Sequence, residues 1–386
     1  MAQSVANRVA LYASVGPELT HYEVDVEGAA LARRGTVALP ANVHYAWPHA
    51  SRRFLYVASS DSASGIGGVV GRNHHVTALA IDPASGALSR HGEPIELPTR
   101  PIHMTTDIPS EYILVAFSNP SGLNVYRINS DFTPGAEVSQ SDDIDPGIYA
   151  HQVRVRPDNR VVILVARGHD ANGVKPEEPG ALQVFSYRNG QLTAEISIAP
   201  GGGYGFGPRH LDFHPTQPWL YVSLERQNRL DMFHHTDNSL LAAPLDQQGT
   251  LGEPDNIRGR QAAGTVHVHP NGRTVYVANR ASSTRDGMFV GGENTIAVFA
   301  IDGATGELRP IQHVDTRGIH CRTFHIDPSG RLLVAAHIMG LATSDGFVPA
   351  ALSLFRIADD GKLDFVRKYD VEVGDRQMFW MGMVGL

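Results

Sequence analysis

Arginine, histidine and glutamate residues recur beside short strand-like segments, in positions where they could bind an anion and move protons. Glu225, Arg280 and His337 each directly follow such a segment. A second group directly precedes one, and it consists of His103, His151, Arg209, His210, Arg322 and Arg376. Guanidinium groups bind oxyanions and stay protonated near neutral pH, whereas a carboxylate or an imidazole can take or give a proton. These residue types predict chemistry on a small anionic substrate.

Motifs for other kinds of site are incomplete. The glycine-rich run 201–207 does not match G-x-G-x-x-G and precedes a strand-like segment instead of a helix, which argues against dinucleotide binding. No G-x-S-x-G nucleophile elbow occurs. His267 and His269 alternate onto one face of a strand, but no HExxH motif, cysteine pair or dense carboxylate set accompanies them. We therefore predict neither a metal site nor a cofactor.

The elements that must position the candidate residues are strands, because one phrase recurs along the chain. It consists of a short strand, a proline turn and an aromatic or aliphatic strand that ends in a small residue, as in HMTTDIPSEYILVAFS from His103. The turn prolines are Pro48, Pro109, Pro157, Pro215, Pro270 and Pro328. A third, alternating strand and a more variable fourth strand follow each phrase. Four antiparallel strands per repeat correspond to one blade of a β-propeller.

The two ends of the chain determine the number of blades. Residues Val9 to Leu39 supply the second, third and fourth strands of a unit, and the segment from Arg376 to Val384 resembles the missing first strand. Six complete units and this composite one predict an all-β, seven-bladed propeller, closed by pairing of the terminal strands in one blade. We expect residues 1–386 to form this single domain.

In such a blade the first strand begins on one face and the second strand returns to it, so the candidate residues should share one rim. Four long insertions follow second strands and should cover the same face: Ser60–His75, Arg167–Gly180, Ala281–Glu293 and Ile338–Ala350. Loops of this length are usually functional. The structural alternative is a set of salt bridges between blades, but burying several guanidinium groups around one or two carboxylates is costly without an anionic ligand.

Composition limits the partners and the compartment. A net charge of −8 argues against general nucleic-acid binding. The one cysteine, Cys321, suits a reducing compartment, and no apolar run is long enough for a membrane helix. No secretory signal is evident between Met1 and Arg8. We expect a cytoplasmic protein that is a monomer or a weak homo-oligomer, with a small molecule as its partner.

The chain resembles the propeller lactonase family, which includes bacterial 6-phosphogluconolactonase and the fungal carboxy-cis,cis-muconate cyclase. The most specific matching segments are 207–215 (GPRHLDFHP) with 221–225 (YVSLE), and 151–160 (HQVRVRPDNR). The segments 267–273 (HVHPNGR) and 322–330 (RTFHIDPSG) also match. The resemblance covers nearly the whole chain. It implies lactone chemistry at His151, Arg209, Glu225 and Arg280, with Arg322 at another matching position. The insertions depart from the family and put the identity of the substrate in doubt.

Hydrolysis of a lactone needs an activated water, a stabilised oxyanion and a proton for the leaving alkoxide. Glu225 or His151 could be the general base, and we favour Glu225 as base with His151 as proton donor. Arg209 and Arg280 could pair with the oxyanion or with an anionic group of the substrate. His103, His210, Arg322, His337 and Arg376 are predicted to bind substrate. Two alternatives remain open: a muconate-type cycloisomerase that forms a lactone, and a non-catalytic binding platform.

Overall fold

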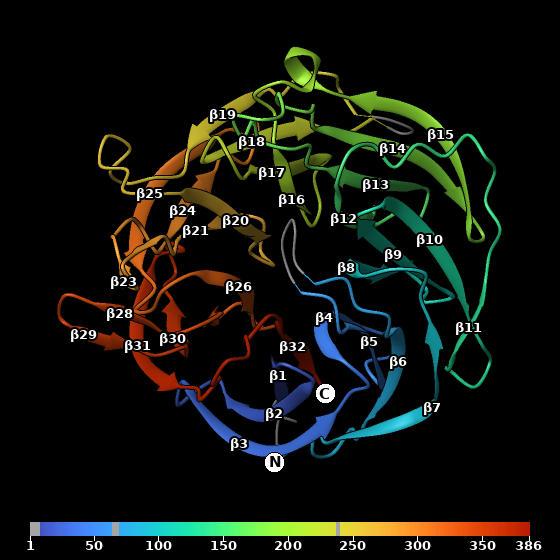
Figure 1. Ribbon diagram of the computed structural model, residues 1–386, viewed down its shortest axis with the longest axis horizontal. Helices are drawn as coiled ribbons and strands as arrows, with labels where there is room; N and C mark the ends of the chain where they lie inside the picture. Colours follow the sequence, from blue (N-terminus) through green and yellow to red (C-terminus); the bar gives the residue numbers. More distant parts are fainter. Residues whose placement is uncertain (1–7, 64–68, 237–239) are drawn as a thin grey trace.

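The computed structural model describes residues 8–63, 69–236 and 240–386, and within these ranges seven four-stranded antiparallel sheets surround a central axis (Figure 1). We number the blades 1 to 7 in the order in which their innermost strands occur along the chain. Blades 1 to 3 are β4–β7 (Asn42–Pro48, Phe54–Ser60, His74–Ile81, Leu88–Glu96), β8–β11 (Pro101–Thr106, Tyr112–Ser118, Ser121–Ile128, Pro134–Glu137) and β12–β15 (Ala150–Val155, Val161–Ala166, Ala181–Arg188, Gln191–Ile198). The seven-bladed fold expected from the repeat is confirmed.

The other four blades follow the same plan, from the axis outward. Blades 4 and 5 are β16–β19 (Pro208–Phe213, Trp219–Leu224, Arg229–His234, Asp246–Gly249) and β20, β21, β24, β25 (Gln261–Val268, Thr274–Ala281, Thr295–Ile301, Leu308–Asp315). Blade 6 is β26, β27, β30, β31 (Cys321–Ile326, Leu332–His337, Ala351–Ile357, Leu363–Asp370). Blade 7 is β32 (Met381–Gly385) with β1–β3 (Val9–Val15, Glu18–Asp25, Ala30–Ala38). A short 3₁₀ segment, η1 (Pro200–Gly203), precedes blade 4.

Blade 7 joins the two ends of the chain, as the sequence predicts. Strand β32 pairs with β1 in antiparallel register, with Leu11 opposite Met383. The strand begins later than expected, at Met381, so Arg376 lies in the preceding loop and not at a strand start.

Apolar side chains between neighbouring blades hold the ring together. The second strands read as continuous apolar runs, such as VVILVA in β13, because both of their faces are covered by neighbouring blades. Leu114 and Leu164 belong to the cluster between blades 2 and 3. Leu11 lies in a cluster with Val334 of blade 6, and Tyr12, the next residue, lies in a cluster with Leu55 of blade 1. Blade 7 is therefore packed on both sides, which closes the ring.

Two of the predicted insertions form a small sheet of their own. Within 281–293 lie β22 (Thr284–Arg285) and β23 (Met288–Phe289), and within 338–350 lie β28 (Leu341–Thr343) and β29 (Gly346–Val348). These strands pair in the order β22-β23-β28-β29, which links blade 5 to blade 6 outside the ring of blades. Residues 64–68 of the first insertion lie outside the described residues.

A β-bulge interrupts the inner strand of five blades close to its start. In each of these five blades, one residue of the first strand has no paired residue in the second strand. These residues are His44, Ile102, His151, Arg209 and Arg322. A bulge leaves one residue unpaired and changes the direction of its side chain, and bulges are common beside active sites. No helix within the described ranges is long and apolar enough to span a membrane.

Candidate active site

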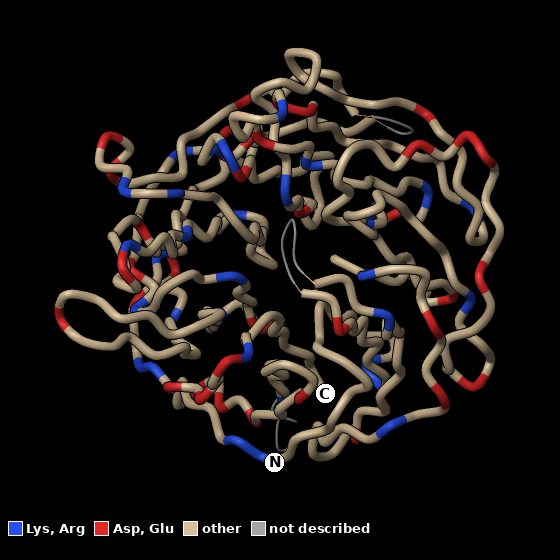
Figure 2. Tube along the Cα trace, in the orientation of Figure 1, with Lys and Arg blue, Asp and Glu red and all other residues tan. Residues whose placement is uncertain are grey.

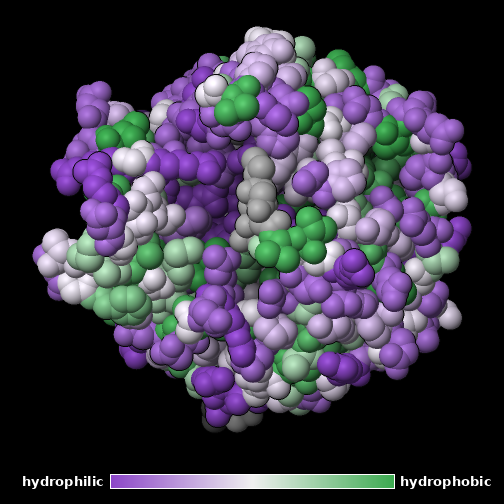
Figure 3. Space-filling model, in the orientation of Figure 1, coloured by the Kyte–Doolittle hydropathy of each residue, from purple (hydrophilic) through white to green (hydrophobic). Residues whose placement is uncertain are grey.

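A cavity of about 320 Å³ opens at the end of the axis where the inner strands begin. Its wall comes mainly from pairs of residues two positions apart along the chain. In each pair, one residue precedes the inner strand of a blade. The pairs are Arg100 and Ile102, Tyr149 and His151, Arg260 and Ala262, His320 and Arg322, and Gln377 and Phe379. Figure 3 shows a hydrophilic hollow on this face of the molecule.

Positive charge dominates the cavity. Among the described residues, its lining has one carboxylate, that of Glu225, and six arginines: Arg100, Arg167, Arg209, Arg260, Arg280 and Arg322. Over the described chain as a whole, acidic positions lie mainly on outer loops, while basic positions also occur on inner segments near the axis (Figure 2). A protein of net negative charge thus carries a strongly cationic pocket.

Glu225 lies at the centre of the arginine cluster. It directly follows β17 and is 5% exposed. The guanidinium group of Arg167 donates to its Oε2 at 2.5 Å, and Nη2 of Arg280 donates to its Oε1. Nε of Arg209 lies 3.3 Å from Oε1. Burial raises the pKa of the Glu225 carboxyl, but Arg280, Arg209, Arg167 and Arg260 together bring it well below its usual range. This group is therefore an ionised counterion.

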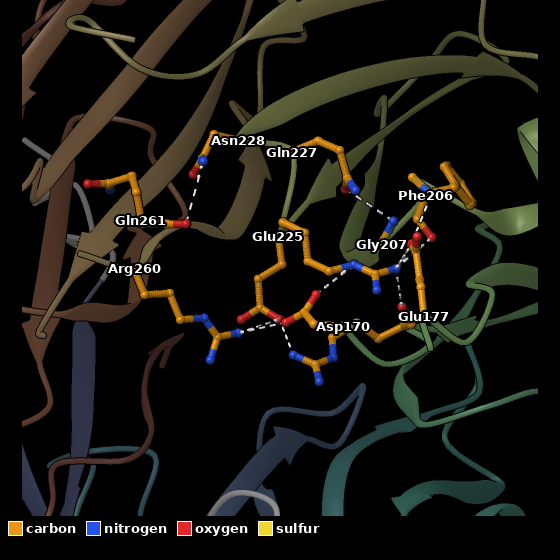
Figure 4. Close-up of polar contacts among 12 residues, drawn as sticks. Asp170, Glu177, Phe206, Gly207, Glu225, Gln227, Asn228, Arg260 and Gln261 are labelled. Atoms are coloured by element: carbon orange, nitrogen blue, oxygen red, sulfur yellow. Dashed lines mark hydrogen bonds and ion pairs between the residues drawn. The ribbon is translucent and has the colours of Figure 1, made fainter. Parts of the chain in front are cut away.

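Acidic residues of the insertion 167–180 reach the mouth of the cavity. Arg226, which is largely buried, anchors the insertion because its Nε lies 3.2 Å from Asp170 and its Nη2 lies 3.4 Å from Glu177. Arg260 is more exposed and extends toward both Asp170 and Glu225, at 3.8 and 3.9 Å (Figure 4). The insertion therefore forms part of the rim of the pocket, as its position after a second strand predicts.

Several buried guanidinium nitrogens have no hydrogen-bond partner within the described residues. They are Nη1 of Arg209 and Nε of Arg100, Arg209 and Arg280. Burial and the neighbouring Arg280 lower the pKa of Arg209, and burial with Arg280 and Arg100 lowers that of Arg322 to about 9. Within the described lining, the single carboxylate of Glu225 balances only part of the charge of six arginines. The pocket is thus suited to an anion.

His151 supplies a neutral imidazole to the same wall. Burial, followed by the nearby Arg209 and Arg167, lowers the pKa of His151 well below its usual value. The ring of Tyr149 is close to both His151 and Arg167. Its centroid lies 6.4 Å from that of the His151 ring and 4.4 Å from Cζ of Arg167. A neutral imidazole beside arginines can accept a proton from water at neutral pH.

The structure brings together five of the predicted residues and places four elsewhere. His151, Arg209, Glu225, Arg280 and Arg322 line one cavity. The residues that do not line it are His103, His210, His337 and Arg376. Their placement contradicts the prediction that they reach the same wall.

The bulge explains two of these differences. His103 and His210 each follow the bulged residue and are buried, with ring centroids 6.2 Å apart. His103 packs against Tyr45, which lines a second cavity at the other end of the inner strands. These histidines therefore lie in the axial core between the two cavities, one residue beyond the position that faces the pocket.

The other two predicted binding residues have different surroundings. His337 is fully buried, its Nδ1 hydrogen-bonds the Ala351 carbonyl at 3.0 Å, and the backbone of Gly318 packs against its ring. Arg376 pairs with Glu18 at 3.7 Å and lines a neighbouring surface pocket, because the loop before β32 carries it away from the axis.

Among the polar residues of the wall that sequence reasoning missed are three arginines, a tyrosine and a histidine. Arg167 directly follows the second strand of blade 3, where the rule that identified Glu225 and Arg280 also applies. The other four, Arg100, Tyr149, Arg260 and His320, each stand one residue before an inner strand. A search two positions upstream of His151 and Arg322, which the sequence analysis had singled out, would have found Tyr149 and His320.

A family model described as "Lactonase, 7-bladed beta-propeller" matches residues 9–340. The chain belongs to this family. Among curated relatives, 6-phosphogluconolactonase of Bacillus subtilis (strain 168) is 27% identical over 339 residues, covering 85% of this chain and 87% of that protein. The protein of the same name from Enterobacter sp. (strain 638) is 28% identical, covering 82% and 83%. The family expected from the sequence motifs is confirmed.

Solved structures share the fold over nearly the whole chain. The periplasmic gluconolactonase of Pseudomonas aeruginosa has a TM-score of 0.71 and 21% identity, covering 98% of this chain and 99% of that one. A protein from Lactobacillus plantarum has a TM-score of 0.72, again with 21% identity and coverage of 98% and 99%. At this identity the likeness concerns the fold.

Proposed function

We propose that the protein is a lactonase that hydrolyses a small sugar-type lactone carrying an anionic group. The observation that carries this proposal is the cavity lining of six arginines around one carboxylate, with a neutral imidazole beside them. The names of the curated relatives support a sugar lactone, with a phosphate as the anionic group.

The unpartnered arginines bind the charged parts of the reaction. A guanidinium group can pair with a phosphate or carboxylate on the substrate, and another can stabilise the oxyanion that forms when the lactone carbonyl is attacked. Arg209 is the best placed for the oxyanion, since it is almost fully buried and its Nη1 has no partner in the described chain. Arg100, whose Nε has no partner in the described chain, and Arg322, whose Nε donates to the Phe379 carbonyl at 3.1 Å, also line the cavity and can contact the substrate anion.

His151 acts as the general base. Its imidazole removes a proton from water as the water oxygen bonds to the carbonyl carbon. When the ring carbon–oxygen bond breaks, the ring oxygen keeps the electron pair and takes this proton back from the imidazolium. The product acid then ionises and releases one proton to solvent. This assignment reverses the preference drawn from the sequence.

Glu225 organises the arginines instead of accepting a proton. Arg167, Arg209 and Arg280 all contact its carboxylate. Because they occupy both of its oxygens and lower its pKa, it is poorly placed to accept a proton from water, whereas Nδ1 of His151 has no hydrogen-bond partner among the described residues. Its two oxygens fix the directions in which these guanidinium groups present their remaining donors to the substrate.

A substrate panel tests the proposal. The purified protein is offered aldonolactones, 6-phosphoaldonolactones and muconolactones, and acid release is followed at constant pH with and without a chelator. We expect fastest release from a phosphorylated or carboxylated sugar lactone, with the same rate in chelator. No acid release from any lactone would overturn the proposal, and lactone formation from a muconate would indicate a cycloisomerase instead.

A further inference from the structure

A second neutral imidazole reaches the cavity from the side opposite to His151. His320 stands immediately before the inner strand of blade 6, and His151 lies in blade 3, so the two are as far apart in the ring as seven blades allow. Both line the cavity. A reacting group held between them could be contacted by an imidazole from either side.

The backbone of His320 is held in a conformation that few non-glycine residues adopt. Its φ is +57°, and its N–H donates to Oδ1 of Asn294 at 2.7 Å. The same oxygen accepts the N–H of Ala281 at 3.1 Å, so one side chain fixes His320 to the end of β21. Non-glycine residues in this region are strained and concentrate at functional sites.

The ring of His320 is oriented by Ser282, another residue of the cavity wall. Nδ1 of His320 lies 2.9 Å from Oγ of Ser282. If the serine hydroxyl donates to Nδ1, the ring carries its one proton on Nε2. Nε2 is buried and has no hydrogen-bond partner among the described residues. Because His320 lines the cavity, a ligand atom held against this wall would be the missing partner of Nε2.

The charges around His320 keep its ring neutral. Burial, followed by Arg280, Arg322 and Arg209, lowers the pKa of His320 well below its usual value, and Glu225 only partly opposes this effect. A neutral imidazole in a cationic pocket is a hydrogen-bond donor that stabilises a developing negative charge without giving up its proton.

We propose that His320, oriented by Ser282, is a further catalytic residue that donates a hydrogen bond from Nε2 to the ring oxygen of the lactone. This inference rests on the proposed lactonase function. As the ring carbon–oxygen bond breaks, the ring oxygen keeps the electron pair, and the hydrogen bond stabilises the alkoxide until it takes the proton held by His151. His320 ends the reaction with the proton it had at the start.

Leaving-group dependence provides the test. Wild type, His320→Gln and Ser282→Ala are assayed on the sugar lactone that wild type hydrolyses fastest and on dihydrocoumarin, whose leaving oxygen is a phenol. Loss of one donor to a developing oxyanion lowers kcat about 10²–10³-fold. We expect His320→Gln to show this loss on the sugar lactone, with KM nearly unchanged, and a loss below about 10-fold on dihydrocoumarin, since a phenoxide needs little stabilisation. Ser282→Ala should lose about 10-fold on the sugar lactone.

Histidine labelled with ¹⁵N gives a second readout that does not depend on turnover. The Nε2 signal of His320 is the one that the His320→Gln spectrum lacks. It should have the chemical shift of a protonated nitrogen, and it should move when gluconolactam, an unreactive ring analogue, is added. His313→Gln, on the exposed outer strand of blade 5, is the control variant and should match wild type. Equal losses on both lactones, an unchanged kcat or an unprotonated Nε2 would each overturn the role of His320. Absence of wild-type hydrolysis would instead contradict the lactonase proposal.

Discussion

The two ends of the propeller axis carry cavities of the same volume, about 320 Å³ each, but the charges that line these cavities are balanced at one end only. Where the inner strands begin, six arginines surround one carboxylate. Where they end, Arg154 is paired with Asp212 at 3.0 Å and lies over the ring of Trp47, 5.3 Å from Cζ to the ring centroid. Asp212 also accepts the N–H of Val268 at 2.9 Å. Charge is balanced at one end and in excess at the other.

This difference separates a structural ion pair from a binding site. A buried pair with good geometry needs nothing from outside, whereas unpaired buried cations are costly unless a ligand supplies the missing anion. Excess charge, and not the mere presence of charged residues near the axis, is therefore the reason why we propose the arginine-lined end as the functional one. The following four predictions test this comparison.

Replacing one arginine at each end should have opposite consequences. Arg209→Met should lower kcat/KM by about 10³-fold, because an oxyanion donor is lost. Arg154→Met should leave kcat nearly unchanged but lower the free energy of unfolding by about 2–3 kcal/mol, because Asp212, which is 15% exposed, loses its arginine partner and keeps only His267 and the N–H of Val268. Steady-state kinetics and urea denaturation measure the two effects. A large loss of kcat in Arg154→Met would remove the distinction between the two ends.

Removing the carboxylate should destabilise the protein at either end of the axis, but an added anion should restore stability mainly at the arginine-lined end. Glu225→Gln and Asp212→Asn should each lower the free energy of unfolding by about 3–5 kcal/mol. Added phosphate should recover much of the loss in Glu225→Gln, since the arginine cluster can bind it, and little in Asp212→Asn. Thermal melts in phosphate and in chloride of equal ionic strength give the comparison. Equal recovery in both variants would contradict it.

Anion binding to the wild-type protein should itself be visible as stabilisation. A ligand at 100 times its Kd adds about 2.7 kcal/mol to the free energy of unfolding. We expect 6-phosphogluconate to raise Tm in this way, and neutral glucose to leave it unchanged. The shift should shrink in Arg322→Met and persist in Arg154→Met. A shift that is the same in both variants would place the anion elsewhere.

Acid should destabilise the fold through the buried histidines of the inner strands. The pKa values of His151, His210 and His103 are lowered in the folded state, chiefly by burial. Below about pH 6.5 the unfolded chain binds protons that the folded chain does not, so the free energy of unfolding falls as pH falls. Each such group contributes at most about 1.4 kcal/mol per pH unit. His103→Gln should reduce the slope of stability between pH 7 and 5; an unchanged slope would show that His103 is not held neutral.

The blade pattern and much of the site could be predicted because both follow from strand periodicity. Alternation, turn prolines and the composite seventh blade are properties of short segments. The rule that strand starts and strand ends share a rim sufficed for His151, Arg209, Glu225, Arg280 and Arg322.

The remaining differences between the sequence predictions and the structure arise where a shift of one residue in strand register changes the direction of a side chain. An inner-strand bulge has no sequence signature here, and a shift of one residue moves a side chain to another face. His103 and His210 were misplaced for this reason. Arg260 and His320 lie in loops whose backbone path depends on contacts with distant residues, such as that of His320 with Asn294. Such contacts are not evident from local sequence patterns.

The composite blade also has a consequence for the order of events during synthesis. The innermost strand of blade 7 is translated after all the others, while its partner β1 is translated first. Phe379, which holds Arg322 through a carbonyl 3.1 Å from its Nε, belongs to the same late segment. The proposed reaction centre therefore stays incomplete until β32, which follows every other strand of the propeller in the chain, has docked against β1.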